Sequence, residues 1–137
     1  MFTINAYIPN PGSDVLADWY AHHPARQWTK LWAQYYNIWL HLRQQPRNGW
    51  TGAYFHPLTD KEGVGRIGFQ HKRIAYRHLG FFGPAANEFT LLLMAEEHNH
   101  VYLPKGCTDT AVSRMKLIYQ DRSRVRIATI QVPPENV

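Results

Sequence analysis

The sequence predicts an α+β domain, in which two amino-terminal helices pack on an antiparallel meander sheet and a further helix follows toward the carboxyl terminus. The first observation is an aromatic stripe of helical period between Pro24 and Gln44. The second is a series of strand-length apolar runs between Val64 and Leu103, separated by short polar turns. Because helical and strand patterns are grouped along the chain, helices and sheet are expected to form separate layers of one domain, residues 1–137.

The amino-terminal segment predicts a short strand followed by the two helices. Residues 2–8 are rich in strand-forming side chains. Ser13 and Asp14 supply N-cap chemistry for a helix that runs through His22. Pro24 suits the first turn of the second helix. The apolar stripe of that helix consists of Trp28, Leu31, Trp32, Tyr35, Trp39 and Leu42. A stripe this regular is typical of a helix that faces a core rather than of a cofactor site.

The middle of the chain predicts three consecutive antiparallel strands, residues 64–70, 73–82 and 88–97. The stretch before them is ambiguous, and within it Tyr54 and Phe55 are expected to be buried. One face of this sheet should pack on the tryptophan-rich helix, which leaves the other face free to bind a ligand.

The carboxyl-terminal part predicts one helix, one strand and a frayed end. Thr108 and Asp109 provide cap chemistry for the helix. Residues 126–132 alternate in polarity and are interpreted as a last strand, and the polar end from Pro133-Pro134 onward is expected to fray.

The register of the three strands decides which side chains share a face. If His71 and Lys72 form a two-residue turn, Arg66 lies opposite Arg77. If residues 84–87 also form a four-residue loop, basic and acidic side chains gather on one face. These side chains are Arg66, Arg73, Arg77, Glu96, His98 and His100. A five-residue loop instead moves the histidines away from the arginines, and this alternative stays open.

Composition favours an anionic partner. The formal net charge is +5 and the sequence contains a single cysteine, Cys107. One cysteine excludes a disulfide framework within the chain and a cysteine-rich zinc site. No amino-terminal signal peptide and no apolar run of membrane-spanning length is recognised, so a cytoplasmic protein without a membrane partner is expected.

The predicted cluster suits the chemistry of an RNA phosphodiester. Arginine binds phosphate oxygens through two donors, and histidine exchanges protons near neutral pH. RNA supplies its own nucleophile, the 2′-OH, so neither metal nor cofactor is required. Tyr102 or Tyr76 could stack on a base. His98, His100 and Glu96 have spacing that allows metal ligands, but no further ligand is evident and a metal site is not expected.

Several segments together resemble the phage-derived, HigB-like branch of the RelE toxin superfamily. The resemblance extends over residues 14–125, and its most specific part is the Tyr-Arg…Gly-Phe-Phe-Gly-Pro stretch. The segments that carry it are Gln44–Trp50, Gly65–Phe69, Tyr76–Pro84, Glu88–Leu92 and Pro104–Arg114. The resemblance implies a RelE-like microbial RNase fold and the toxin half of a type II toxin–antitoxin pair, which cuts mRNA, often on the ribosome. It also implies a cognate antitoxin protein as partner.

The resemblance also implies roles for individual residues. Arg77 matches the strand position that binds and stabilises the scissile phosphate, and the basic position after the third strand points to His98 and more loosely to His100. Two departures stand out. Gly68 occupies a position where relatives usually have arginine, with Arg66 two residues earlier on the same strand face. Relatives are lysine-rich where this chain reads Glu96-Glu97-His98.

Together these observations predict a metal-independent, mRNA-cleaving endoribonuclease. The expected catalytic residues are Arg77, Arg66 and His98, and the expected RNA-binding residues are Lys72, Arg73, His100, Tyr102 and Lys105. Two alternatives stay open. One is a catalytically silent module of the same fold that binds RNA or protein, and the other is an interaction protein without a nucleic-acid role. Dependence of cleavage on the ribosome also stays open.

Overall fold

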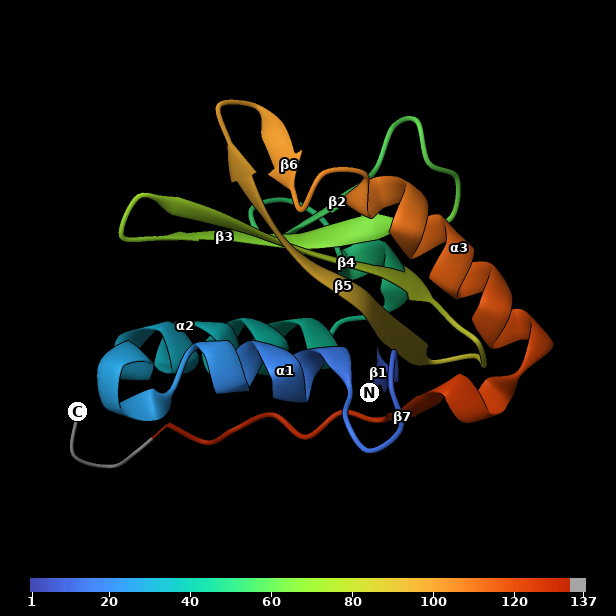
Figure 1. Ribbon diagram of the computed structural model, residues 1–137, viewed down its shortest axis with the longest axis horizontal. Coiled ribbons are helices and arrows are strands. Elements are labelled where there is room, and N and C mark those ends of the chain that lie inside the picture. Colours follow the sequence, from blue (N-terminus) through green and yellow to red (C-terminus); the bar gives the residue numbers. More distant parts are fainter. Residues whose placement is uncertain (134–137) are drawn as a thin grey trace.

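Within residues 1–133, seven strands form one mostly antiparallel sheet, in the order β2-β3-β4-β5-β1-β7, with β6 paired to β5 (Figure 1). The strands are β1 Thr3–Tyr7, β2 Phe55–Pro57, β3 Gly65–His71, β4 Ile74–Phe82, β5 Glu88–His98, β6 Val101–Leu103 and β7 Val125–Ile127. The α-helices are α1 Val15–His22, α2 Ala25–Arg43 and α3 Cys107–Gln120, with 3-10 turns at Arg47–Gly49 and Arg122–Arg124. This computed structural model describes residues 1–133 and confirms the predicted α+β class. The frayed end was predicted from Pro133-Pro134 onward, and all of it after Pro133 lies outside the described residues.

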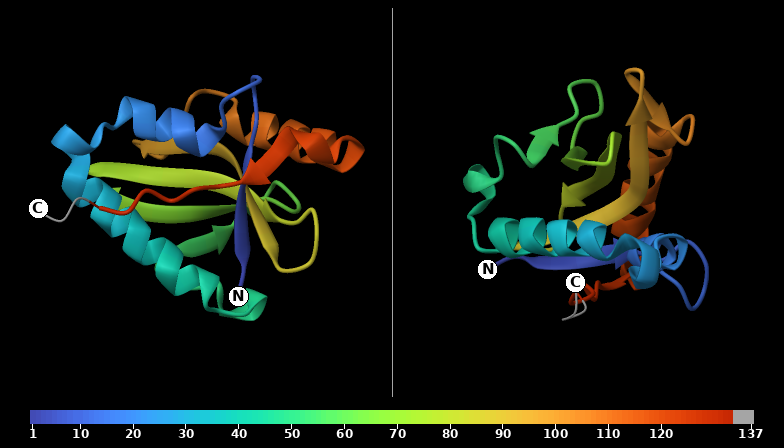
Figure 2. Two further views of the ribbon diagram at one scale, coloured as in Figure 1. Left: turned by 90° about the horizontal axis from the view of Figure 1, so that it is seen from below. Right: turned by 90° about the vertical axis from the view of Figure 1, so that its left-hand side faces the viewer.

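The helices cover the two faces of the sheet unequally. Helices α1 and α2 lie along one face, and α3 lies on the other side (Figure 1). Strand β4 alternates between these environments: the His78 ring contacts Trp19 of α1 and Tyr35 of α2, whereas Phe81 contacts Tyr119 of α3. We call these sides the α1/α2 face and the α3 face. Strand β5 curves along its length, so its carboxyl end and β6 stand away from α1 and α2 (Figure 2).

The predicted helix start at Asp14 is confirmed and has a second partner. The Asp14 carboxylate accepts a hydrogen bond from the backbone N–H of Ala17 at 2.8 Å, as an N-cap does. Its other oxygen accepts from Arg126 Nε at 2.6 Å, which fastens the start of α1 to β7. The aromatic stripe of α2 faces the core as predicted: Leu31, Tyr35, Ile38, Trp39 and Leu42 are buried.

Three features of the sheet differ from the sequence-based prediction. Strand β1 pairs in parallel with β5, so the sheet is more than an antiparallel meander. Strand β2 was not predicted, because Pro57 and its neighbours lack a strand pattern. Phe55 is buried as expected, but Tyr54 is 39% exposed and the prediction for it is wrong, since it precedes the strand and points out of the core.

The predicted register between β3 and β4 is wrong by two residues. His71 pairs with Ile74, so the turn consists of Lys72 and Arg73, both at positive φ of 48° and 69°. Two consecutive residues with positive φ form the turn whose twist matches an antiparallel hairpin. As a result Arg77 lies opposite Gly68 rather than Arg66.

A one-residue irregularity in β5 determines which side chains of its carboxyl-terminal half lie on each face of the sheet. Leu79 pairs with Leu93 and Gly80 pairs with Leu91, so Leu92 is an extra residue on β5. The Leu92 carbonyl accepts a hydrogen bond from Arg114 Nη1 of α3 at 2.8 Å. A bulge of one residue reverses the face of every later side chain relative to an uninterrupted register.

Candidate functional site

Four polar side chains from four adjacent strands meet on the α3 face. They are Arg66 on β3, Arg77 on β4, Glu97 on β5 and Tyr102 on β6. Arg77 pairs with Gly68, which is two residues from Arg66 and hence on the same face. Glu97 is the cross-strand partner of Tyr102. We refer to these four residues as the Arg-Glu-Tyr cluster.

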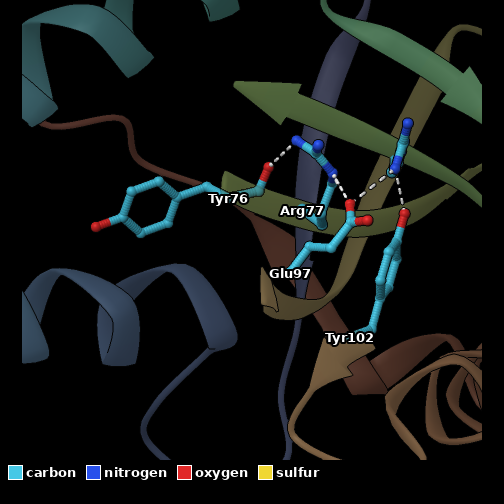
Figure 3. Close-up of polar contacts among 5 residues, drawn as sticks. Tyr76, Arg77, Glu97 and Tyr102 are labelled. Carbon is cyan, nitrogen blue, oxygen red and sulfur yellow. Dashed lines mark hydrogen bonds and ion pairs between the residues drawn. The ribbon is translucent and has the colours of Figure 1, made fainter. Parts of the chain in front are cut away.

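Glu97 is the centre of the cluster's hydrogen bonds and ion pairs (Figure 3). Its Oε1 accepts a hydrogen bond from Arg77 Nε at 2.8 Å and lies 3.5 Å from Arg66 Nη1. Arg66 Nη1 also donates to the Tyr102 hydroxyl, and Arg77 Nη1 donates to the backbone carbonyl of Tyr76 at 3.1 Å. The two guanidinium groups are therefore held in fixed positions about one carboxylate.

The cluster keeps a net positive charge and access to solvent. Two arginines and one glutamate sum to one positive charge, from +2 and −1. The side chains of Arg66, Arg77 and Glu97 are 25%, 20% and 19% exposed, so all three are partly desolvated. A partly desolvated positive site interacts more strongly with an entering anion than the same charges do in bulk water.

Gly68 leaves room for the guanidinium of Arg77. A Cβ atom built at Gly68 would lie 3.1 Å from Arg77 Nη1, tighter than an ordinary van der Waals contact. The Arg77 side chain therefore lies across the strand surface at a point where β3 has no side chain. A side chain at position 68 would therefore require Arg77 Nη1 to shift by a few tenths of an ångström.

A cavity of about 390 Å³ opens beside the cluster. Arg66 and Tyr102 form part of its lining, and His56 of β2 lies in the same lining. His56 is the cross-strand partner of Arg66. The sequence-based prediction missed His56 because it left the stretch just before residue 64 ambiguous and assigned no strand there.

The structure separates several residues that the prediction placed together. The predicted shared face is wrong for Glu96 and His98, because the extra Leu92 turns them to the α1/α2 face and brings Glu97 to the arginines instead. His98 Nε2 lies 3.0 Å from Glu96 Oε1, on an exposed strand end. Tyr76 is fully buried, so the expectation that it could stack on a base is also wrong.

Of the predicted RNA-binding residues, one belongs to the Arg-Glu-Tyr cluster and the others lie on turns and loops outside it. Tyr102 belongs to the cluster. Arg73 does not share the predicted face, because it lies with Lys72 at the exposed β3–β4 turn. His100 lies at the exposed turn between β5 and β6, with a positive φ of 66°. Lys105 is exposed in the loop that leads into α3.

Glu97 is the cluster member that the predicted register did not put on the same face as the two arginines. Both glutamates were visible in the sequence, but only the extra residue in β5 decides which of them faces the arginines. The run Leu91-Leu92-Leu93 gives no signal for that bulge, because leucine is compatible with either face. All three leucines are in fact buried.

Within residues 1–133, no group of three histidine, cysteine, aspartate or glutamate side chains is arranged to hold a metal ion. Among the same residues, no helix has both the length and the apolar character needed to cross a membrane. Comparisons with protein-family models, with curated proteins and with solved structures find no match to the chain.

Proposed function

We propose that the protein is an endoribonuclease toxin of the RelE-like, HigB-like type, which cleaves mRNA by attack of the 2′-OH on the adjacent phosphate. The observation that carries the proposal is the pair Arg66 and Arg77, held about Glu97 on a partly exposed sheet face. The resemblance over residues 14–125 supports the same reading, since Arg77 matches the phosphate-binding position of that family.

In this proposal the two arginines bind the scissile phosphate. A guanidinium offers paired N–H donors to phosphate oxygens and stays charged throughout the reaction. Because the arginines are already positioned by Glu97 and by the Tyr76 carbonyl, little reorganisation is needed when charge develops on the phosphoryl oxygens.

Glu97 accepts the proton of the attacking 2′-OH. Its carboxylate contacts both arginines, so it would lie beside a phosphate that both guanidinium groups bind. Tyr102 anchors Arg66 through its hydroxyl and offers its ring for stacking of a base. The exposed Lys72, Arg73 and Lys105 contact the RNA backbone farther from the reacting phosphate. The antitoxin is a protein that covers the basic surface around the cluster.

The test is cleavage of a labelled RNA by the purified protein in the presence of EDTA, and of mRNA on translating ribosomes in a parallel reaction. We expect products with 2′,3′-cyclic phosphate and 5′-hydroxyl ends, and growth arrest when the protein is induced in bacteria. Arg77→Ala should reduce cleavage about 10²–10³-fold, because a preorganised transition-state donor is lost, and should relieve the arrest. Arg26→Ala, at an exposed position of α2, is the matched control. Equal activity of Arg77→Ala and the wild type would remove Arg77 from the mechanism.

A catalytically silent RNA-binding module is the second candidate. The observation that favours it is the contact of Glu97 with both arginines, which occupies donors that a phosphate needs. Binding to RNA with a steep dependence on salt, without cleavage on or off the ribosome, would select this second function. In that case Glu97→Gln should strengthen RNA binding, because it removes the competing charge.

A further inference from the structure

A histidine on the edge strand faces the same cavity as the cluster. His56 on β2 pairs with Arg66 on β3 in an antiparallel register. Residues directly opposite each other in such a pair project to the same face, with Cβ atoms about 4.5–5.5 Å apart. His56 is exposed, and its ring has no hydrogen bond to any of residues 1–133 that the structure describes.

The cavity places His56 and Tyr102 around Arg66. All three line the space of about 390 Å³, together with Thr59, Asp60 and Thr108. One wall comes from β2 and the loop after it, and the other comes from β6 and the start of α3. The ion pair between Lys61 Nζ and Asp109 Oδ1, 2.6 Å apart, joins the loop after β2 to the first turn of α3.

Two candidate proton-transfer groups thus approach Arg66 from opposite sides. In the strand order, β3 lies between β2, which carries His56, and β4 and β5, the second of which carries Glu97. In a phosphoryl transfer the attacking and leaving oxygens lie roughly in line on opposite sides of phosphorus. A phosphate bound at Arg66 therefore has a carboxylate on one side and an imidazole on the other.

We propose that His56 is a catalytic residue of the endoribonuclease, the general acid that protonates the leaving 5′-oxygen. This inference rests on the proposed function. As the bond from the 2′-oxygen to phosphorus forms, the 2′-OH proton passes to Glu97. The bond between phosphorus and the 5′-oxygen breaks with its electron pair on oxygen, which takes a proton from the His56 imidazolium. The products are a 2′,3′-cyclic phosphate and a 5′-hydroxyl, and proton exchange with water restores both side chains.

The other histidines near the sheet have positions that do not serve this role. His98 is on the α1/α2 face beside Glu96, and His100 is at a turn tip. His71 Nδ1 is 3.1 Å from Gln34 Oε1 at the far end of β3, and His78 is fully buried among aromatic rings. His56 is the histidine that lines the cavity with Arg66.

The decisive experiment compares two RNA substrates that differ in one bridging atom. In one, the leaving 5′-oxygen is replaced by sulfur, and a thiolate leaves without needing a proton. We expect His56→Gln to slow single-turnover cleavage of the oxygen substrate about 10²-fold or more, and to leave cleavage of the sulfur substrate within about twofold of the wild type. Glu97→Gln and Arg77→Ala should slow both substrates. His41→Gln, at an exposed position of α2, is the matched control and should change neither.

The pH dependence supplies a second readout. The charged and titratable groups that face His56 in the cavity are Arg66, Asp60 and Tyr102. His56→Gln should remove the fall in rate on the alkaline side, whereas Asp60→Asn should keep it. His56→Ala should regain cleavage of the oxygen substrate when imidazole is added.

Three results would overturn the inference in distinguishable ways. Equal slowing of both substrates by His56→Gln, in a protein with unchanged circular dichroism, would show that His56 does not protonate the leaving group. An unchanged alkaline limb would do the same. Failure of the wild type to cleave either substrate, with or without ribosomes, would remove the proposed function and this role together.

Discussion

The two faces of β3 and β4 place neighbouring residues in opposite physical environments. On the α1/α2 face, Phe69 and His78 lie in a buried aromatic layer. One residue away on the α3 face, Gly68 and Arg77 belong to a charged site that stays partly exposed. Alternation along a strand therefore separates what stabilises this fold from what we propose carries its chemistry. Substitutions on the two faces should change different measured quantities.

The largest expected effect is on the α1/α2 face. Phe69 stacks on Tyr35 and Tyr76, with ring centroids 5.2 Å and 5.1 Å away. Phe69→Ala should lower the free energy of unfolding by about 3–5 kcal/mol, because it removes buried apolar surface and leaves a cavity. Urea denaturation measures this change. Gln70→Ala, at the exposed next position, should stay within about 0.5 kcal/mol. Similar losses for both variants would mean that the aromatic layer does not dominate stability.

The same face should make the protein sensitive to acid. Burial lowers the pKa of His78 to about 3, and the nearby charge of His23 adds to the lowering. The unfolded chain binds a proton at an ordinary histidine pKa near 6.5, and the folded chain does not until far lower pH. The stability contributed by neutral His78 is therefore present above pH 6.5 and is lost as pH falls toward about 3.

We expect a loss of about 3 kcal/mol between pH 6.5 and pH 4 from this histidine, at 1.36 kcal/mol for each unit of pH. His78→Asn should be less stable at pH 7 but should show a correspondingly flatter acid limb in urea denaturation. His98→Asn, on the exposed strand end, is the control and should keep the wild-type slope. Parallel acid limbs for the wild type and His78→Asn would assign the acid sensitivity to other groups.

A smaller effect on stability and on RNA cleavage is expected from substitution of Gly68, on the α3 face of β3. The Cβ added by Gly68→Ala would crowd Arg77 Nη1, which can move because it ends a flexible side chain. Stability should change by less than about 1 kcal/mol, since alanine is at least as compatible with a strand as glycine. RNA cleavage should fall about 10-fold, because the guanidinium shifts from its preorganised position. In an Arg77→Ala background, Gly68→Ala should have no further effect on cleavage, and an additive loss would contradict this coupling.

The sequence carries strong signals for where helices begin and which side they bury, and weak signals for the register between strands. The Asp14 cap and the α2 stripe were predictable because cap chemistry and helical period are local. The turn at Lys72-Arg73 was placed one residue early, because neither residue is typical of a turn with two positive φ angles. The bulge at Leu92 was not predictable, since β5 is covered on both faces there and its leucines do not alternate with polar residues.

These two local features decided the composition of the site. Arg66 and Arg77 share a face under either register, because a shift by two residues preserves the face of a side chain. Glu97 and His98 exchange places, because the bulge shifts β5 by one residue. Predicting His56 as a site residue would have required predicting strand β2. The strand conformation of β2 comes from pairing with β3 rather than from its own sequence. Side chains on well-patterned strands were thus foreseeable, and those beyond a bulge or on an edge strand were not.

The smallest effect is expected at the Tyr102 hydroxyl, which accepts a hydrogen bond from Arg66. Tyr102→Phe keeps the ring for base stacking but removes this acceptor, so the Arg66 guanidinium loses one of its two anchors and keeps Glu97 at 3.5 Å. Because the site is partly exposed and water can replace the hydroxyl, cleavage should fall only about 3- to 10-fold, corresponding to about 0.6–1.4 kcal/mol. Tyr102→Ala should cost more than Tyr102→Phe, since stacking is worth about 1–3 kcal/mol per base. Single-turnover cleavage of one RNA by all three proteins separates the two contributions, and equal losses for the two variants would mean that the ring takes no part in binding.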